Sequence, residues 1–226
     1  MGRDDILTGF RQEAKALVHV ASGLSETDFG KPTPCAPWTV TELLAHVVAG
    51  IERVTDGLTV PEPATAPLNA VNYYNPRIFD AQANIERVAL AQRSATAYPS
   101  GRAVVAALDA AWPLVHDSAR REPDDRRLMT RWSVGMGLTD FLITRVAELA
   151  LHGLDLAAAL DRTPWTTPEA AAIVTTLLLV SGNPDDLAPL DWDPMTYLAK
   201  ASGRTPLTVD EAAHVKQVGV EWIPLG

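Results

Sequence analysis

The chain has 226 residues, of which 47% are apolar, so it is long enough to bury a core as one domain, or as one domain with an appendage. Its formal net charge of −9 predicts repulsion from nucleic acid and from anionic membrane surfaces, and neither is expected as a partner. The single cysteine, Cys35, excludes an internal disulfide, and the N-terminus carries charges where a secretory signal would be apolar. The longest apolar run is too short to span a bilayer, so we expect a soluble cytoplasmic protein.

Helical spacing of apolar residues dominates the sequence from its beginning. Thr39 and Glu42 form a capping box just before an apolar run, which predicts that a helix begins there and continues to about residue 56. Strand-like alternation of useful length is absent, so an all-α protein is predicted. The long helices are expected over residues 4–21, 40–56, 76–97, 101–120 and 138–161.

Two features interrupt this helical pattern. Pro113 lies inside the helix expected over 101–120 and is predicted to kink it or end it early. Residues 121–137 are rich in charge and are predicted to form a loop. Shorter helices are expected after residues 167, 193 and 208, where helix-start signals recur. We therefore expect a helical bundle over residues 1–163 and a small helical C-terminal extension over residues 164–226.

The segment "AELALHGLDLAAAL" is a strongly apolar helix that carries three polar side chains. Glu148, His152 and Asp155 are spaced by four and by three residues, so they lie on one face of the helix. Burying a carboxylate without a counter-charge is costly. A bound metal ion would explain this stripe, whereas the simpler alternative is a hydrogen bond between Glu148 and His152 or a pair with Arg145.

His46 is the histidine best placed to complete such a site. It lies in "LLAHVV", on a helix face whose apolar neighbours must point into the bundle. A lone histidine on an apolar face is more often a core residue with one hydrogen-bond partner, and that alternative stays open. Together with Glu148 and His152, however, it would provide the imidazole and carboxylate ligands that Zn²⁺ commonly takes.

The sequence resembles a known family at two segments. "DFGKPTPCAPWTVTELLAHVVAG" is similar to the P-x-W-x-V-x-x-L-L-x-H segment of the mycothiol-dependent maleylpyruvate isomerase-like proteins, which belong to the DinB/YfiT-like superfamily of metal-binding four-helix bundles. "GMGLTDFLITRVAELALHGLDLAAAL" is similar to the family's second signature, E-x-x-x-H-G-x-D-L-A. The resemblance covers roughly residues 5–163 and implies a DinB-like four-helix bundle.

This resemblance implies roles for particular residues. The family's metal triad falls on His46, Glu148 and His152, and the aspartate of its second signature falls on Asp155. An Asn- and Arg-bearing stretch, here "NYYNPRIFDAQ", suggests that Arg77 meets an anionic substrate, although a surface arginine is an equal alternative. "YLAKASGRTPL" is similar to an "LSGR" element of some members. Its arginine is Arg204, which would reach the site or cap the preceding helix.

Three functions are consistent with these residues. The first is an enzyme whose metal ion activates a low-molecular-weight thiol, implied by the resemblance to be mycothiol, for addition to, transfer to or isomerisation of a small electrophile. The second is a hydrolase that uses metal-bound hydroxide with Asp155 as a base. The third is a non-enzymatic bundle with a structural or vestigial metal site. Zn²⁺ is the expected divalent metal, with Ni²⁺ or another ion as the alternative, and a homodimer is left open as the oligomeric state.

Overall fold

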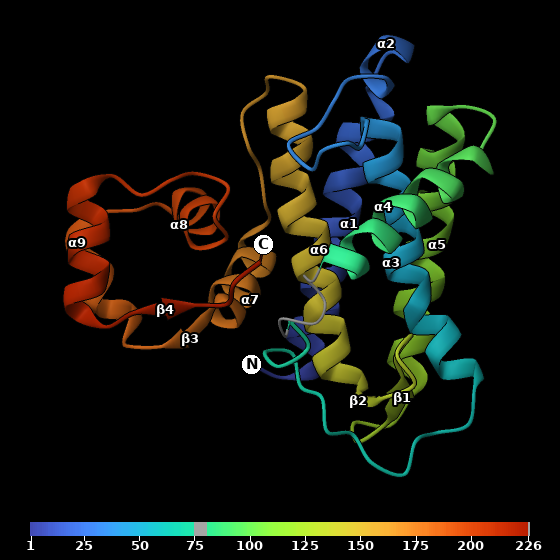
Figure 1. Ribbon diagram of the computed structural model, residues 1–226. Coiled ribbons are helices and arrows are strands. Elements are labelled where there is room, and N and C mark those ends of the chain that lie inside the picture. The colour runs from blue at the N-terminus through green and yellow to red at the C-terminus, as the bar shows by residue number, and fades with distance from the viewer. Residues whose placement is uncertain (75–80, 226) are drawn as a thin grey trace.

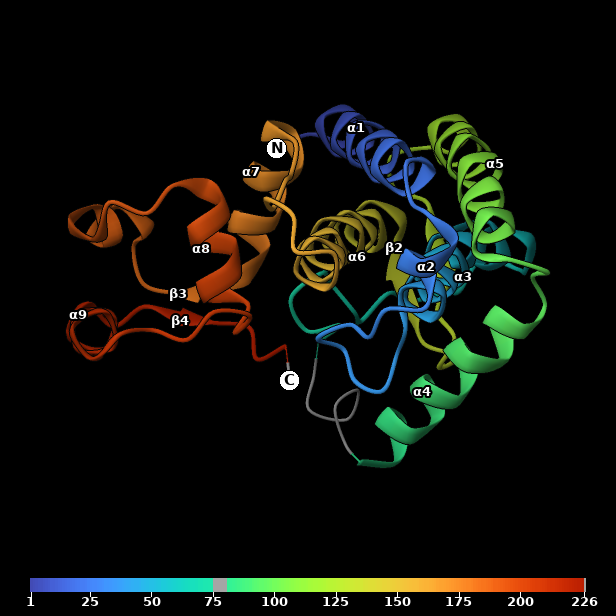
Figure 2. The same ribbon diagram turned by 90° about the horizontal axis from the view of Figure 1, so that it is seen from above.

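A computed structural model describes residues 1–74 and 81–225 of the chain (Figure 1). Four long helices form a bundle in which α1 and α3 each pack against both α5 and α6 (Figure 2). The predicted all-α fold is confirmed. Within the described residues, no helix combines the length and the apolar character needed to cross a membrane. The bundle helices are α1 (Arg3–Ser22), α3 (Val40–Thr59), α5 (Gly101–Arg121) and α6 (Leu138–Ala159).

Two further helices accompany the bundle. The short helix α2 (Glu26–Phe29) lies in the connection between α1 and α3. Helix α4 (Ala81–Thr96) packs against the outside of α3 (Figure 2). The helix expected over 76–97 is confirmed from residue 81 onward, whereas residues 75–80 lie outside the described part of the chain.

The first residue of α3 is fixed by the predicted capping box. Thr39 Oγ1 accepts a hydrogen bond from the backbone N–H of Glu42, and a carboxylate oxygen of Glu42 accepts one from the backbone N–H of Thr39 at 2.7 Å. Such reciprocal bonds satisfy two backbone donors that the helix itself leaves unpaired. The cap therefore sets where on α3 each later side chain points.

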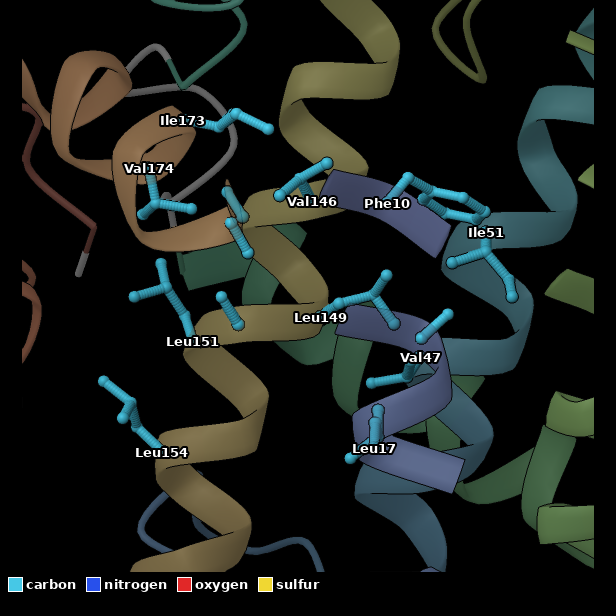
Figure 3. Packing of buried hydrophobic residues seen from close by; sticks show 14 of the residues in the cluster. Phe10, Leu17, Val47, Ile51, Val146, Leu149, Leu151, Leu154, Ile173 and Val174 are labelled. Carbon is cyan, nitrogen blue, oxygen red and sulfur yellow. The ribbon is translucent and has the colours of Figure 1, made fainter. Parts of the chain in front are cut away.

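The bundle core gathers between α1, α3 and α6. Figure 3 shows Phe10 and Leu17 of α1, Val47 and Ile51 of α3 and Leu149 of α6 pointing into this space. Each of these side chains is at most 1% exposed. Burying a side chain of this size contributes roughly 1.5–3 kcal/mol, so this core holds α3 and α6 in register.

The opposite face of α6 packs against the next helix of the chain. Leu151 of α6 points toward Val174 of α7, and Ile173 of α7 points back toward α6 (Figure 3). Helix α7 (Pro168–Leu178) also packs against α1, and its Pro168 stands at the first helical position as predicted. Helix α6 is therefore covered on two faces, which explains why its sequence is apolar nearly all round.

The C-terminal part is defined here as the described residues 164–225, and beyond α7 it lies to one side of the bundle (Figure 1). Strand β3 pairs antiparallel with β4, and rings of Trp192, Tyr197 and Trp222 lie 6.3–6.4 Å apart. The expected division after residue 163 falls in the connection between α6 and α7, and it stays a prediction. The remaining elements are β3 (Leu179–Ser181), the 3₁₀ helix η2 (Pro184–Leu190), α8 (Pro194–Ala201), α9 (Val209–Val218) and β4 (Glu221–Trp222).

Two sequence expectations are wrong. The segment expected to be a loop contains an antiparallel hairpin of β1 (Arg127–Met129) and β2 (Gly135–Gly137), and each strand is too short to show alternation. The early end expected at Pro113 is also wrong, because helix α5 continues through Pro113 to Arg121. The carbonyl that Pro113 leaves without an N–H partner belongs to Asp109, whose exposed position allows water to replace the lost bond.

Candidate metal centre

Two adjacent helices carry the three side chains that the sequence predicts as metal ligands. His46 lies in the second turn of α3, and Glu148 and His152 lie one turn apart on α6, which packs directly against α3. Their side chains are 12%, 19% and 13% exposed, respectively. The cluster is therefore largely enclosed by the bundle but still in contact with solvent.

The donor atoms lie close enough to share one ion. His46 Nε2 is 3.2 Å from Glu148 Oε2, and His152 Nε2 is 3.3 Å from the same oxygen. One donor atom from each side chain lies within 4.8 Å of the other two. Ligand atoms bonded to tetrahedral Zn²⁺ at about 2.0–2.2 Å lie roughly 3.4 Å apart, so this donor set fits a single divalent ion.

A second carboxylate holds the outer nitrogen of His152. His152 Nδ1 lies 2.9 Å from Asp155 Oδ2, and Arg204 donates from Nε to Oδ1 and from Nη2 to Oδ2, both at 2.8 Å. A carboxylate behind a ligating imidazole fixes the orientation of the ring and makes its other nitrogen a better ligand. Since Arg204 follows α8, the C-terminal part reaches the bundle at this contact.

Cys35 is also part of this neighbourhood. Its thiol donates a hydrogen bond to Asp155 Oδ2 at 3.2 Å, and Cys35, His152 and Asp155 form a second group of donor atoms within 4.8 Å. The sequence shows no base near Cys35 because Asp155 lies 120 residues further along the chain. Only the packing of the loop before α3 against α6 brings the two together.

Burial and hydrogen bonding shift the pKa values of the three predicted ligands in different directions. Burial alone would raise the pKa of Glu148, but hydrogen bonds with His152 and His46 outweigh it and hold this pKa well below 4.5. Burial lowers the pKa of His46 to about 4, although Glu148 opposes the shift. Burial acts in the same direction on His152, but contacts with Asp155 and Glu148 prevail and its pKa lies well above 6.5. At neutral pH Glu148 is therefore ionised and His46 neutral, which are the forms that coordinate a divalent ion.

A buried guanidinium supports Glu148 from within the bundle. Arg145 is 1% exposed, and its Nη2 lies 3.9 Å from Glu148 Oε1. It donates to the carbonyl of Gly50 at 3.1 Å and to the hydroxyl of Tyr73 at 3.2 Å. A Cβ atom at Gly50 would lie 3.3 Å from Arg145 Nη1, so glycine leaves room for this contact. A buried cation with these partners favours the ionised form of Glu148.

Trp38 forms an aromatic wall beside the cluster. The side chain is 4% exposed, and its ring centre lies 4.7 Å from that of His46 and 6.4 Å from that of His152. The ring excludes water from one side of both imidazoles. In the sequence, Trp38 follows a proline and directly precedes the capping box, and this position was the signal that could have placed it beside His46.

The structure brings most of the residues singled out in the sequence to one place. His46, Glu148 and His152 converge, and Asp155 and Arg204 meet directly behind His152. Arg77 lies outside the described residues. The sequence reasoning did not place Cys35 and Trp38 at this cluster, and it offered Arg145 only as an alternative partner of Glu148.

The fold and the cluster define a class, the helical bundles with inward-facing imidazole and carboxylate donors on neighbouring helices. The family described as "Mycothiol maleylpyruvate isomerase N-terminal domain" matches residues 10–157, which is about two thirds of the chain and most of the bundle. The chain therefore belongs to this family, as its two sequence segments predict.

Individual proteins are similar to parts of the chain. Two proteins of Mycobacterium tuberculosis, both described as uncharacterised, are each 33% identical over 64 residues, which is 28% of this chain. The chain matches only 35% of the length of each. The crystal structure of the mycothiol-dependent maleylpyruvate isomerase has a TM-score of 0.53 at 16% identity, covering 77% of this chain and 68% of that one. A mutant of that isomerase gives the same TM-score at 15% identity, and at these identities the likeness concerns the fold.

Proposed function

We propose that this protein is a metal-dependent enzyme that activates a low-molecular-weight thiol for addition to, transfer to or isomerisation of a small electrophile. The observation that carries this proposal is the donor set of His46, Glu148 and His152, which within the described residues has no fourth protein donor and keeps contact with solvent. Catalytic metal sites leave such a position free for water or substrate. Membership of a family named for mycothiol supports mycothiol as the thiol.

We expect the side chains of the cluster to have two kinds of role, metal binding and positioning. His46, Glu148 and His152 would hold Zn²⁺, with Ni²⁺ as the alternative, and the ion would lower the pKa of a coordinated thiol below its free value of about 8.5. Asp155 and Arg204 would act as positioning residues, because they touch His152 and each other. Both stay proposals, as does a contact of Arg77 with substrate.

Isomerisation is the reaction that the named relative suggests. A thiolate that adds reversibly to a conjugated double bond leaves a single bond about which the substrate can rotate. Elimination then restores the double bond and releases the thiol unchanged, so thiol would act as a cosubstrate that is not consumed. Maleylpyruvate, named for the solved relative, is the first electrophile to test.

The hydrolase alternative relies on Asp155 as a proton acceptor. Both oxygens of Asp155 accept hydrogen bonds from Arg204, and one also contacts His152. Burial would raise the pKa of Asp155, but the contacts with His152 and Arg204 outweigh it and lower this pKa. A carboxylate held in this way is a weak base, which favours the thiol-dependent proposal.

Replacement of the metal by cobalt gives a direct test. Mycothiol, titrated into the cobalt-loaded protein, is expected to produce a sulfur-to-cobalt charge-transfer band, and His46→Ala should produce none. A parallel assay would follow maleylpyruvate turnover with and without mycothiol. An unchanged spectrum with every small thiol, together with thiol-independent hydrolysis of an ester or amide, would instead establish the hydrolase.

A further inference from the structure

His152 presents its two ring nitrogens to two different sets of donor atoms. Its Nε2 lies 3.3 Å from Glu148 Oε2, the oxygen that also contacts His46. Its Nδ1 lies 2.9 Å from Asp155 Oδ2, and the same oxygen accepts a hydrogen bond from the thiol of Cys35 at 3.2 Å. One donor atom each from Cys35, His152 and Asp155 lies within 4.8 Å of the other two. The proposed function makes no use of the Cys35 thiol.

This second set of donors combines a thiol, an imidazole and a carboxylate. Zn²⁺ takes Cys sulfur at about 2.3 Å and nitrogen or oxygen ligands at about 2.0–2.2 Å, so donors around one tetrahedral ion lie roughly 3.4–3.6 Å apart. The observed separations from Asp155 Oδ2, 3.2 Å to the sulfur and 2.9 Å to the imidazole nitrogen, are only slightly shorter. A small outward movement of the side chains would therefore admit an ion. Thiolate is a soft ligand, which favours Zn²⁺ and similar ions over Mg²⁺ or Ca²⁺.

The loop that carries Cys35 is held in place by its own hydrogen bonds. The backbone N–H of Thr33 donates to the carbonyl of Trp38 at 2.9 Å, and the N–H of Trp38 donates to the carbonyl of Cys35 at 3.0 Å. Trp38 is itself buried against the bundle, whereas Cys35 is half-buried and stays within reach of ions in solution. A ligand that is already in position loses little conformational freedom when an ion binds.

Two features of the site oppose a second ion. Arg204 donates to both oxygens of Asp155 at 2.8 Å, and its guanidinium would repel a cation close to Oδ2. Nε of Arg204 can keep its hydrogen bond to Oδ1 while Oδ2 turns to an ion, so one of the two bonds is lost. An ion held by His46, Glu148 and His152 would also compete for the imidazole, because a ring that ligates through both nitrogens must give up both protons. The second position should therefore be the weaker of the two.

We propose that Cys35, Asp155 and Nδ1 of His152 form a second metal position, which binds a zinc-like divalent ion when such ions are in excess. The ion takes the place of the thiol proton and of the Nδ1 proton, and both protons pass to solvent. This position goes beyond the proposed function and does not depend on it, because it requires neither a thiol cosubstrate nor an electrophile.

Titration of the reduced full chain with cobalt, without any added thiol, tests this position. The chain has a single cysteine, so a thiolate-to-cobalt charge-transfer band under these conditions can come only from Cys35. We expect no band while cobalt fills the site that contains His46, and a band once further cobalt is added. Gel filtration should remove the ion that gives the band and leave the other in place.

Three variants assign the band to this set of donors. Cys35→Ser keeps the size of the side chain and should abolish the band while the first cobalt ion still binds. His46→Ala is the matched variant at the other site, and its band should appear at about tenfold lower cobalt, because no neighbouring ion repels the second or competes for His152. Asp155→Asn replaces a charged ligand by a neutral amide and should require about tenfold more cobalt. Circular dichroism would show that each variant is folded.

Two results would overturn the proposal. One is a titration with no band at any cobalt concentration. The other is a band that neither His46→Ala nor Asp155→Asn alters, which would mean that cobalt binds the cysteine alone.

The proposed function fails or succeeds separately, because its band appears only when mycothiol is added. Cys35→Ser is the protein in which that band belongs to the added thiol alone. No response to mycothiol in Cys35→Ser, with the thiol-free band of the unmodified chain intact, would remove the proposed function and leave the second metal position standing.

Discussion

The bundle and the C-terminal part contribute to the candidate site in different ways. The bundle supplies all three predicted ligands from α3 and α6, two helices that share a continuous core. The C-terminal part supplies Arg204, whose guanidinium reaches Asp155 behind one ligand. All three predicted ligands thus belong to the bundle, whereas the C-terminal part contacts only the carboxylate behind one imidazole. If the two parts contribute separately, substitutions in each should affect metal binding and folding to different degrees.

Removal of a ligand should have the largest effect. His46→Ala is expected to abolish metal retention, by at least about a thousandfold in affinity, because only two protein donors remain. Alanine has a high helix propensity, so α3 should stay formed, as circular dichroism would show. His116→Ala, a histidine of α5 outside the cluster, serves as the control. Metal analysis after gel filtration measures the loss, and tight binding by His46→Ala would assign the site to other ligands.

A cavity in the bundle core and a cavity in the C-terminal part should both lower stability, but only the first should affect metal binding. Leu149→Ala in the bundle core and Leu198→Ala in α8 both remove fully buried side chains, and each should lower the free energy of unfolding by about 2–5 kcal/mol. Only Leu149→Ala should also weaken metal binding strongly, because Leu149 lies between the two ligand-bearing helices. Thermal unfolding with and without Zn²⁺ measures both effects. An equal loss of metal affinity in the two variants would contradict the division.

Loss of the contact between Arg204 and Asp155 should weaken metal binding without abolishing it. Arg204→Met removes both hydrogen bonds to Asp155 and frees His152 to reorient, so metal affinity should fall about 10–100-fold. Lys216→Met, exposed on α9 in the same part of the chain, should leave the affinity unchanged. Competition with a chelator gives the two values. If both variants retain the original affinity, Arg204 has no positioning role toward the metal.

The smallest effect is expected at Glu13, where the bundle meets the C-terminal part, and it concerns the pH dependence of the free energy of unfolding. Glu13 of α1 is buried and accepts hydrogen bonds from Thr167, the N-cap of α7, at 2.7 and 2.8 Å. Its other carboxylate oxygen has no partner among the described residues. Burial raises the pKa of Glu13 above 4.5 against these bonds. The unfolding free energy should therefore fall as pH rises from about 4.5 through the raised pKa, since the unfolded chain ionises first.

Glu13→Gln should remove that pH dependence, measured by denaturant unfolding at several pH values. Glu26→Gln, at an exposed carboxylate, should keep it. If the free energy of unfolding of Glu13→Gln still falls as the pH rises over this range, another titrating group is responsible.

The sequence predicts the bundle well because its signals are local. Thr39 and Glu42 mark the start of α3, and helical spacing alone places Glu148 and His152 on one face. The hairpin was missed because three-residue strands leave no periodic trace. The meeting of Asp155 with Arg204 was beyond reach, since it depends on how residues 49 positions apart pack in three dimensions. The resemblance pointed to both residues, but their mutual ion pair belongs to the fold.

The bidentate contact between Arg204 and Asp155 has a thermodynamic consequence. If docking of the C-terminal part tightens the grip of His152 on a metal ion, then metal binding must tighten that docking by the same factor, because coupling free energies are reciprocal. Metal loading should then protect the connection between α6 and α7 from proteases, to a degree set by how strongly Arg204 favours the metal-bound form. The protease sensitivity of this connection would thereby report whether a metal ion is bound in the bundle.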